Sequence, residues 1–123
     1  MPIIKVWCLP PQSEEQLKAL FDSIIAATVS VRGFNFKGMT DTTVLFPSDM
    51  MSFGIGTDIC IEAGSQAFAP SKVGQEERNA FAQAMVNAVT KHFPKAKIEC
   101  FAFPYDTGVD CGVAHYRPDT NSS

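Results

Sequence analysis

The sequence predicts an α+β domain in which a strand-helix-strand unit occurs twice. Two amphipathic helical patterns share the same internal spacing, and each lies between two apolar, strand-like runs. We therefore expect one domain over residues 1–123, with βαβ repeats at about 2–47 and 57–104 and a C-terminal tail. Two such units predict a four-stranded sheet with both helices on one face.

Each element is marked by its own local pattern. Ser13 and Gln16 have the spacing of a capping box, which predicts the start of the first helix. The second helix is expected from Gln75 to Phe93, with its apolar stripe beginning at Phe81. The expected strands cover residues 3–9, 40–46, 57–63 and 97–103. The apolar stripes of the two helices fall at positions 17, 20, 21, 24, 25 and 28, and at 81, 84, 85, 88, 89 and 92.

Composition and charge exclude several classes of protein. The net charge of -3 and the lack of a basic cluster argue against a nucleic-acid partner. No run reaches the roughly 18 apolar residues of a membrane-spanning helix, so we expect no membrane partner. Polar residues interrupt the N-terminal apolar run too early for a signal peptide, which predicts a cytoplasmic protein. The four cysteines have no metal-ligand spacing, so we expect free thiols and no metal or other cofactor.

The strands carry more apolar residues than two helices can cover. These residues occur at both alternating positions along the strands, so some of them must face away from the helices. We therefore expect another copy of the chain to cover the second face of the sheet. The residues behind this expectation are Trp7, Cys8, Ile61, Cys100, Phe101 and Phe103.

Pro2 gives the strongest indication of chemistry. It follows Met1 directly and begins an apolar strand-like run. If Met1 is removed, the Pro2 nitrogen becomes a free secondary amine, whose pKa burial would lower towards neutrality. Such an amine can act as a general base. The alternative is that proline is a common second residue without a function.

Several stretches resemble the tautomerase superfamily, which includes 4-oxalocrotonate tautomerase, 5-carboxymethyl-2-hydroxymuconate isomerase and macrophage migration inhibitory factor. Weaker similarity continues through the second expected helix. The matching stretches are Met1-Pro2-Ile3-Ile4, Leu9-Pro10-Pro11-Gln12-Ser13-Glu14-Glu15-Gln16 and Met51-Ser52-Phe53-Gly54-Ile55-Gly56. The resemblance implies a tandem βαβ fold, a homotrimer and a proton-transferring Pro2 without a cofactor.

The resemblance also implies candidate substrate-binding residues. Lys37 lies within one residue of a pocket lysine of the cytokine-like members, which makes it the candidate anion-binding residue, although a solvated loop lysine is the alternative. Phe101 and Phe103 occupy the neighbourhood of the family's pocket residues on the last long strand and imply a more apolar pocket. Short members that act on diacids carry arginines where this chain has Gln12 and, nearby, Thr42. A dicarboxylate substrate is therefore not implied.

Together these features predict a cofactor-independent tautomerase or isomerase that acts on a small keto–enol acid. The alternatives are a dehalogenase, hydratase or decarboxylase of the same superfamily, or a trimeric binding protein without activity.

Overall fold

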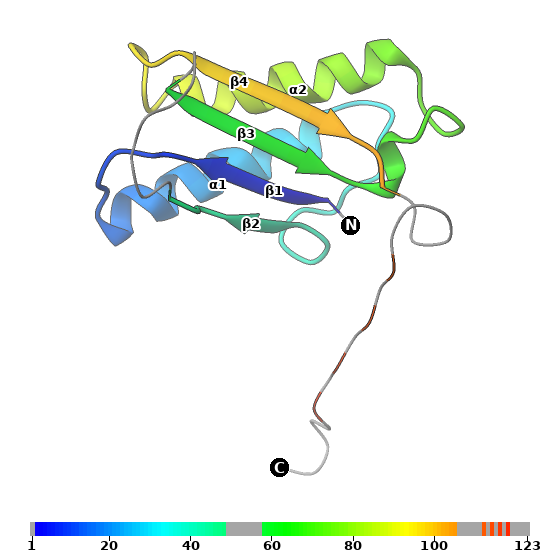
Figure 1. The fold of residues 1–123 in the computed structure, drawn as a ribbon, viewed down its shortest axis with the longest axis horizontal. Helices are drawn as coiled ribbons and strands as arrows, with labels where there is room; N and C mark the ends of the chain where they lie inside the picture. Colours follow the sequence, from blue (N-terminus) through cyan, green and yellow to red (C-terminus); the bar gives the residue numbers. More distant parts are fainter. Residues whose placement is uncertain are drawn as a thin grey trace.

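The computed structural model describes residues 2–48 and 58–105, together with 112, 114, 116 and 118. The elements follow one another as β1 (Ile3–Trp7), α1 (Glu14–Ser30), β2 (Thr43–Leu45), β3 (Ile59–Gly64), the 3-10 turn η1 (Gln66–Phe68), α2 (Gln75–Thr90) and β4 (Ile98–Phe103). The strands form one sheet in the order β2-β1-β3-β4 (Figure 1). β1 and β2 are parallel, as are β3 and β4, while β1 and β3 are antiparallel. The two expected βαβ units are therefore present, and the β1–β3 pair joins them.

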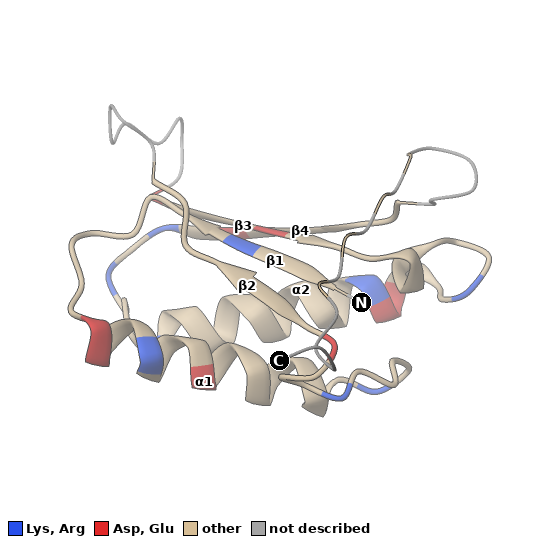
Figure 2. Ribbon diagram, turned by 90° about the horizontal axis from the view of Figure 1, so that it is seen from below, with Lys and Arg blue, Asp and Glu red and all other residues tan. Residues whose placement is uncertain are grey.

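Both helices lie on the same side of the sheet, as the sequence predicts (Figure 2). This side holds the core, because alternate strand residues point towards the helices. Ile4 and Val6 of β1 are fully buried there, as is Ile61 of β3. The opposite side, which we call the open face, is not covered by any described element (Figure 2).

The start of α1 has the expected capping box. The Ser13 hydroxyl accepts the Gln16 N–H at 3.1 Å, and the Gln16 side chain accepts the Ser13 N–H at 2.9 Å. A cap of this kind contributes about 1 kcal/mol, because it satisfies N–H groups that have no partner within the helix. From this start, α1 buries Leu20, Ile24 and Thr28 against the sheet.

Several element boundaries differ from expectation for local reasons. β1 ends at Trp7 because Cys8 has a φ of 71°, outside the range of a strand. β2 is shorter than expected and begins only at Thr43, because the residues before it form a hydrogen-bonded loop. η1 was not expected. It begins where the Ser65 hydroxyl accepts the Ala67 N–H at 3.1 Å, and it buries Phe68.

The apolar strand residues expected at both alternating positions divide between the two faces of the sheet. Ile61 is fully buried on the helix side of β3, and Cys100 is half-buried on the same side of β4. The open face carries Trp7, Phe101 and Phe103 of this set. The strand register decides which alternate residues face outwards, and the apolar pattern alone does not reveal it.

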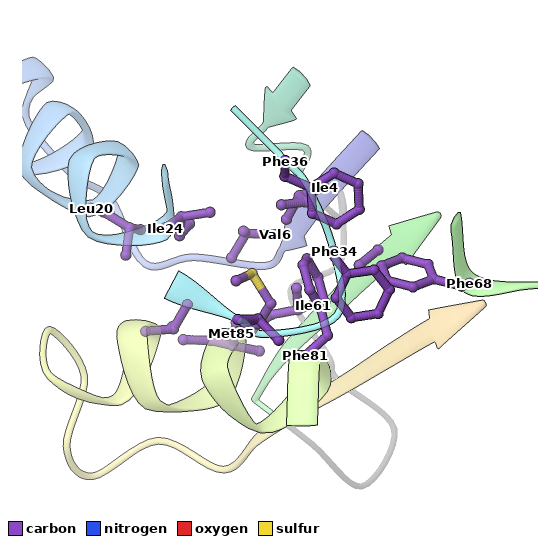
Figure 3. Packing of buried hydrophobic residues seen from close by; sticks show 14 residues of the cluster. Ile4, Val6, Leu20, Ile24, Phe34, Phe36, Ile61, Phe68, Phe81 and Met85 are labelled. Carbon is purple, nitrogen blue, oxygen red and sulfur yellow. The ribbon is translucent and has the colours of Figure 1, made fainter. Parts of the chain in front are cut away.

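Four phenylalanine rings pack together under the sheet (Figure 3). Phe34 and Phe36 stack with their ring centres 5.3 Å apart, and Phe68 meets the Phe81 ring at 4.8 Å. Each such pair adds about 0.5–1.5 kcal/mol beyond the burial of its apolar area. This aromatic cluster fixes the segment between α1 and β2 to the core, because Phe34 and Phe36 belong to that segment.

The segment then turns through a compact loop before β2. Gly38 has a φ of 94°, and the Asp41 N–H donates to its carbonyl at 3.1 Å. The Asp41 carboxylate accepts the Lys37 N–H at 2.9 Å and the Thr42 hydroxyl at 3.1 Å. The hydrogen bond from the Lys37 N–H is the main cause that lowers the pKa of Asp41. We call residues 37–42 the Asp41 loop.

One stretch that carries the resemblance falls on a part of the chain that the structure does not describe. The stretch Met51-Ser52-Phe53-Gly54-Ile55-Gly56 lies outside the described residues. Neither described helix has the length and apolar character needed to cross a membrane.

Replacing Gly38 with alanine should destabilise the protein by about 1–3 kcal/mol, because a left-handed residue with a side chain is strained. The added methyl carbon would also lie 3.2 Å from Val29 Cγ2 and 3.3 Å from Ile25 Cγ2. Urea unfolding measures the change. Gly112→Ala is the matched control, since a methyl group there meets no atom within 4 Å. Equal midpoints for both variants would contradict the assigned conformation of Gly38.

Asp41 should make folding stability depend on pH in the acid range. Its pKa is lowered in the folded state, so its stabilising contribution is present above the unfolded value of 3.8 and is lost as pH falls through the lower folded value. Asp41→Asn should therefore lose less stability than wild type between about pH 5 and pH 2. Urea unfolding across this range tests it, with Asp22→Asn as the control for the change in net charge. Parallel curves for wild type and Asp41→Asn would refute the prediction.

Candidate active site

Pro2 occupies a buried position at the start of β1. Its side chain is fully buried, and its carbonyl accepts the Thr43 N–H at 3.0 Å. The next residue, Ile3, pairs with Thr43 of β2 on one side and with Gly64 of β3 on the other. Pro2 therefore directly precedes a strand that is held on both edges, which fixes its backbone in place.

Lys37 lies on the Asp41 loop, and its side chain is exposed. Hydrogen bonds link its backbone to Pro2 through the loop. The Asp41 carboxylate accepts the Lys37 N–H, and two residues later the Thr43 N–H donates to the Pro2 carbonyl. Among the described residues, no hydrogen bond joins the Lys37 side chain to Pro2. The structure thus brings the loop of Lys37 to Pro2 and leaves the ammonium group at the surface.

The open face near Pro2 is organised in rows across the sheet. Because the register of each strand pair is known, residues that face outwards on neighbouring strands can be matched. The first row is Ile3, Gly64 and Phe103, the second is Lys5, Glu62 and Phe101, and the third is Trp7, Cys60 and Glu99. Phe103 is therefore in the row next to Pro2, and Phe101 is one row further along.

A cavity of about 160 Å³ opens on this face beside Pro2. Ile3 is part of its wall, and consecutive Cα atoms are about 3.8 Å apart, so Pro2 is one residue from the cavity. Phe103 also lines it, whereas Phe101 is 55% exposed in the neighbouring row. The lining residues are Ile3, Lys5, Glu62, Gly64, Phe103 and Tyr105.

Gly64 lets the aromatic rings approach the floor of this cavity. A methyl carbon at Gly64 would lie 3.2 Å from Phe103 Cε2 and 3.4 Å from Tyr105 Cδ1. The distance to Phe103 is shorter than an ordinary contact, so a side chain here would push the Phe103 ring away, and Tyr105 would be in direct contact with it. The bare backbone of Gly64 thus sets the shape of the cavity.

Charged residues alternate with apolar ones on the open face. β1 carries one basic band, while β3 and β4 carry acidic bands (Figure 2). Trp7 Nε1 donates to Glu62 Oε1 at 2.6 Å, which draws this carboxylate towards Trp7. Lys5 is directly opposite Glu62 in the register, yet the described residues give it no ion pair within 4.0 Å.

The Cys60 and Cys100 thiols are poorly suited to nucleophilic chemistry at neutral pH. Burial raises the pKa of Cys100 to about 12, and burial together with the Glu62 and Glu99 carboxylates raises the pKa of Cys60. Cys8, Cys60 and Cys100 are all free thiols in the described structure. Within 2–48 and 58–105, no three His, Cys, Asp or Glu side chains gather as metal ligands.

Sequence reasoning missed Lys5, Glu62 and Tyr105 as cavity residues. A weak signal existed for Lys5, which is the only charged residue in the first strand. Nothing in the sequence shows that Lys5 and Glu62 are opposite each other, because that depends on the β1–β3 register. Tyr105 follows β4 in a stretch for which the sequence predicts no pocket.

No family model and no curated protein matches the sequence. Solved structures do match. A Q0 fused 4-OT, a wild-type symmetric trimer, is 12% identical, with 91% of each chain covered and a TM-score of 0.67. A malonate semialdehyde decarboxylase is 11% identical over 93% of this chain and 92% of its own, with a TM-score of 0.64. MIF2 of Leishmania major is 12% identical over 85% and 89%, with a TM-score of 0.62.

These likenesses cover nearly the whole chain at low identity, so they establish the fold and leave the activity open. They agree with the observed pairing of two βαβ units in one four-stranded sheet. The chain thus has the fold of these solved structures, which is the fold that the resemblance in the sequence implies.

Proposed function

We propose that the protein is a cofactor-independent tautomerase or isomerase that uses the Pro2 amine as general base on a small keto–enol acid. The observation that carries this proposal is the position of Pro2. It is buried at the start of the central strand β1, and it adjoins a cavity on the open face. The enzymes among the structural neighbours support an enzymatic function in general.

The chemistry follows from the amine that removal of Met1 would create. A free α-amino group titrates near pH 7.7–8.0 in peptides, and burial lowers this pKa because it disfavours the ammonium form. The neutral amine takes a proton from the carbon next to a carbonyl, and the electron pair forms the enolate. The resulting ammonium then returns the proton to another atom of the same enolate, which completes the tautomerisation without a cofactor.

The other candidate residues have supporting roles in this proposal. Lys37 attracts the anionic substrate from the Asp41 loop, where its ammonium is exposed near the start of β1. Phe103 contacts the body of the substrate in the cavity. Phe101 extends this apolar surface into the next row of the open face.

The proposed assembly is a homotrimer in which other copies cover the open face. Large apolar side chains on this face are exposed in one chain, including Leu45 at 47% and Phe103 at 42%. Exposed apolar surface of this kind is typical of interfaces. Structural neighbours that form trimers support the same arrangement.

A second candidate function is a decarboxylase or hydratase. The structure of malonate semialdehyde decarboxylase, described as having decarboxylase and hydratase activities, covers 93% of this chain. The same Pro2 amine in its cationic form would supply the proton in such reactions. A dehalogenase and a trimeric binding protein without activity are the remaining alternatives.

Replacing Pro2 with alanine should lower turnover of phenylenolpyruvate-type and 2-hydroxymuconate-type enols by about 10²–10⁴-fold, the usual share of general acid–base catalysis. Mass spectrometry must first show that Met1 is absent, because with Met1 retained the Pro2 nitrogen is an amide. Pro70→Ala, at an exposed position, is the control. Equal rates for wild type and Pro2→Ala would remove Pro2 from the mechanism.

Leu45→Glu should shift the protein from trimer to monomer, because it places a charge on the proposed interface. Leu45 pairs with Lys5 in the β1–β2 register, so the new carboxylate gains a cationic neighbour and the single chain stays folded. Analytical ultracentrifugation at micromolar concentration measures the mass. Val29→Glu on α1 is the matched control, since Val29 is 50% exposed on the opposite side of the sheet. A monomeric wild type would rule out the homotrimer.

A further inference from the structure

We propose that Lys5 binds the substrate carboxylate in the cavity on the open face, with the unsaturated or aromatic body of the acid against Phe103. This inference rests on the proposed function, and it assigns the direct anion contact to a residue other than Lys37. It makes Lys5 the residue that selects small carboxylic acids over neutral compounds of the same shape.

The first argument is the charge balance of the cavity. Lys5 and Glu62 both line it, and they are directly opposite each other on β1 and β3. The Glu62 carboxylate accepts the Trp7 indole N–H at 2.6 Å, and no ion pair within 4.0 Å joins Glu62 to Lys5. In the described structure Lys5 is thus a half-buried cation whose ammonium has no contacting counter-charge within 4.0 Å. A carboxylate ligand would supply that counter-charge.

The second argument is the size and shape of the cavity. A cavity of about 150 Å³ holds a molecule as large as benzene, and the cavity here has about 160 Å³. Phe103 and Tyr105 form an aromatic wall above the bare backbone of Gly64. A flat ring or a conjugated chain fits this wall, with its carboxylate turned to Lys5.

The third argument is the distance along β1. Pro2 and Lys5 are three residues apart, which is about 10 Å in a strand. The long, flexible stem of lysine allows its ammonium to approach the Pro2 end of the cavity. A carboxylate held there would place the neighbouring carbon of the acid close to the Pro2 nitrogen. The exposed Lys37 side chain lies outside this row of the sheet.

The test is the binding of an unreactive acid and of its neutral amide. The probes are 3-phenylpropanoate and 3-phenylpropanamide, and dissociation constants are measured by titration on the intact protein. The fluorescence of Trp7, the only tryptophan, reports on the cavity through its bond to Glu62. Wild type should prefer the carboxylate by about tenfold or more, the usual value of a charged hydrogen bond. Lys5→Met should abolish this preference, and Lys5→Arg should keep most of it.

Three further variants decide the outcome. Lys72→Met, in an exposed loop, removes the same charge and should leave the preference intact. Gly64→Ala should weaken binding of both probes equally, because it moves the aromatic wall and leaves Lys5 in place. If Lys5→Met keeps the preference, or if Lys37→Met abolishes it while Lys5→Met does not, the assignment of Lys5 is wrong. Absence of binding to wild type would also overturn it.

The design separates this inference from the proposed function. Pro2→Ala should retain the carboxylate preference, because the substitution removes the base and does not change the residues that line the cavity. If Pro2→Ala keeps full turnover while Lys5→Met abolishes the preference, the role of Pro2 fails and the role of Lys5 stands. If Pro2→Ala loses turnover and Lys5→Met binds like wild type, Lys5 alone is excluded. Where Lys5→Met fails to fold by circular dichroism, Lys5→Gln replaces it in the same titration.

Discussion

The pairing of β1 on both of its edges is the constraint on which the molecule depends. β1 binds β2 on one side and β3 on the other, and its inward residues Ile4 and Val6 have no exposed surface. A strand in this position cannot slip by one residue without moving these side chains to the open face. The same constraint fixes the chain from Pro2 onwards. An N-terminal residue, which is usually among the most mobile of a chain, would here adjoin the most restrained strand.

The aromatic cluster extends this restraint to the neighbouring loop. Phe34 and Phe36 are held against Phe68 and Phe81, so the chain enters the Asp41 loop from a fixed point. The loop leaves through Thr43, whose N–H binds the Pro2 carbonyl. Core packing and the position of the candidate base are thus connected through a short stretch of backbone. Substitutions in the cluster would therefore affect the site as well as stability.

The sequence predicted the fold well and the site only in part. Helix starts depend on local contacts, and the Ser13–Gln16 capping box was readable because both partners lie within one turn. The outward face of each strand depends on register, which joins residues far apart in the chain. For this reason the sequence did not show which of the apolar strand residues face outwards, or that Lys5 lies opposite Glu62. The cavity at Gly64 and Phe103 could not be predicted for the same reason, because these residues meet only when β3 and β4 are aligned.

The alternation of side chains along β1 places the Pro2 ring on the side of the sheet away from the cavity, yet the Pro2 nitrogen can still reach a substrate there. Side chains on a strand point alternately to its two faces, so the Pro2 ring shares the buried side with Ile4, while Ile3 and Lys5 face the cavity. For any ordinary side-chain base this arrangement would separate the base from the substrate. The reactive atom of an N-terminal proline is its backbone nitrogen, which lies at the end of the strand and belongs to neither face. In the proposed mechanism the buried ring would hold Pro2 in place, while the nitrogen stays within one residue of the cavity wall. Among the residues that could start β1, proline alone carries a secondary amine whose nitrogen is held by a ring to its own Cα.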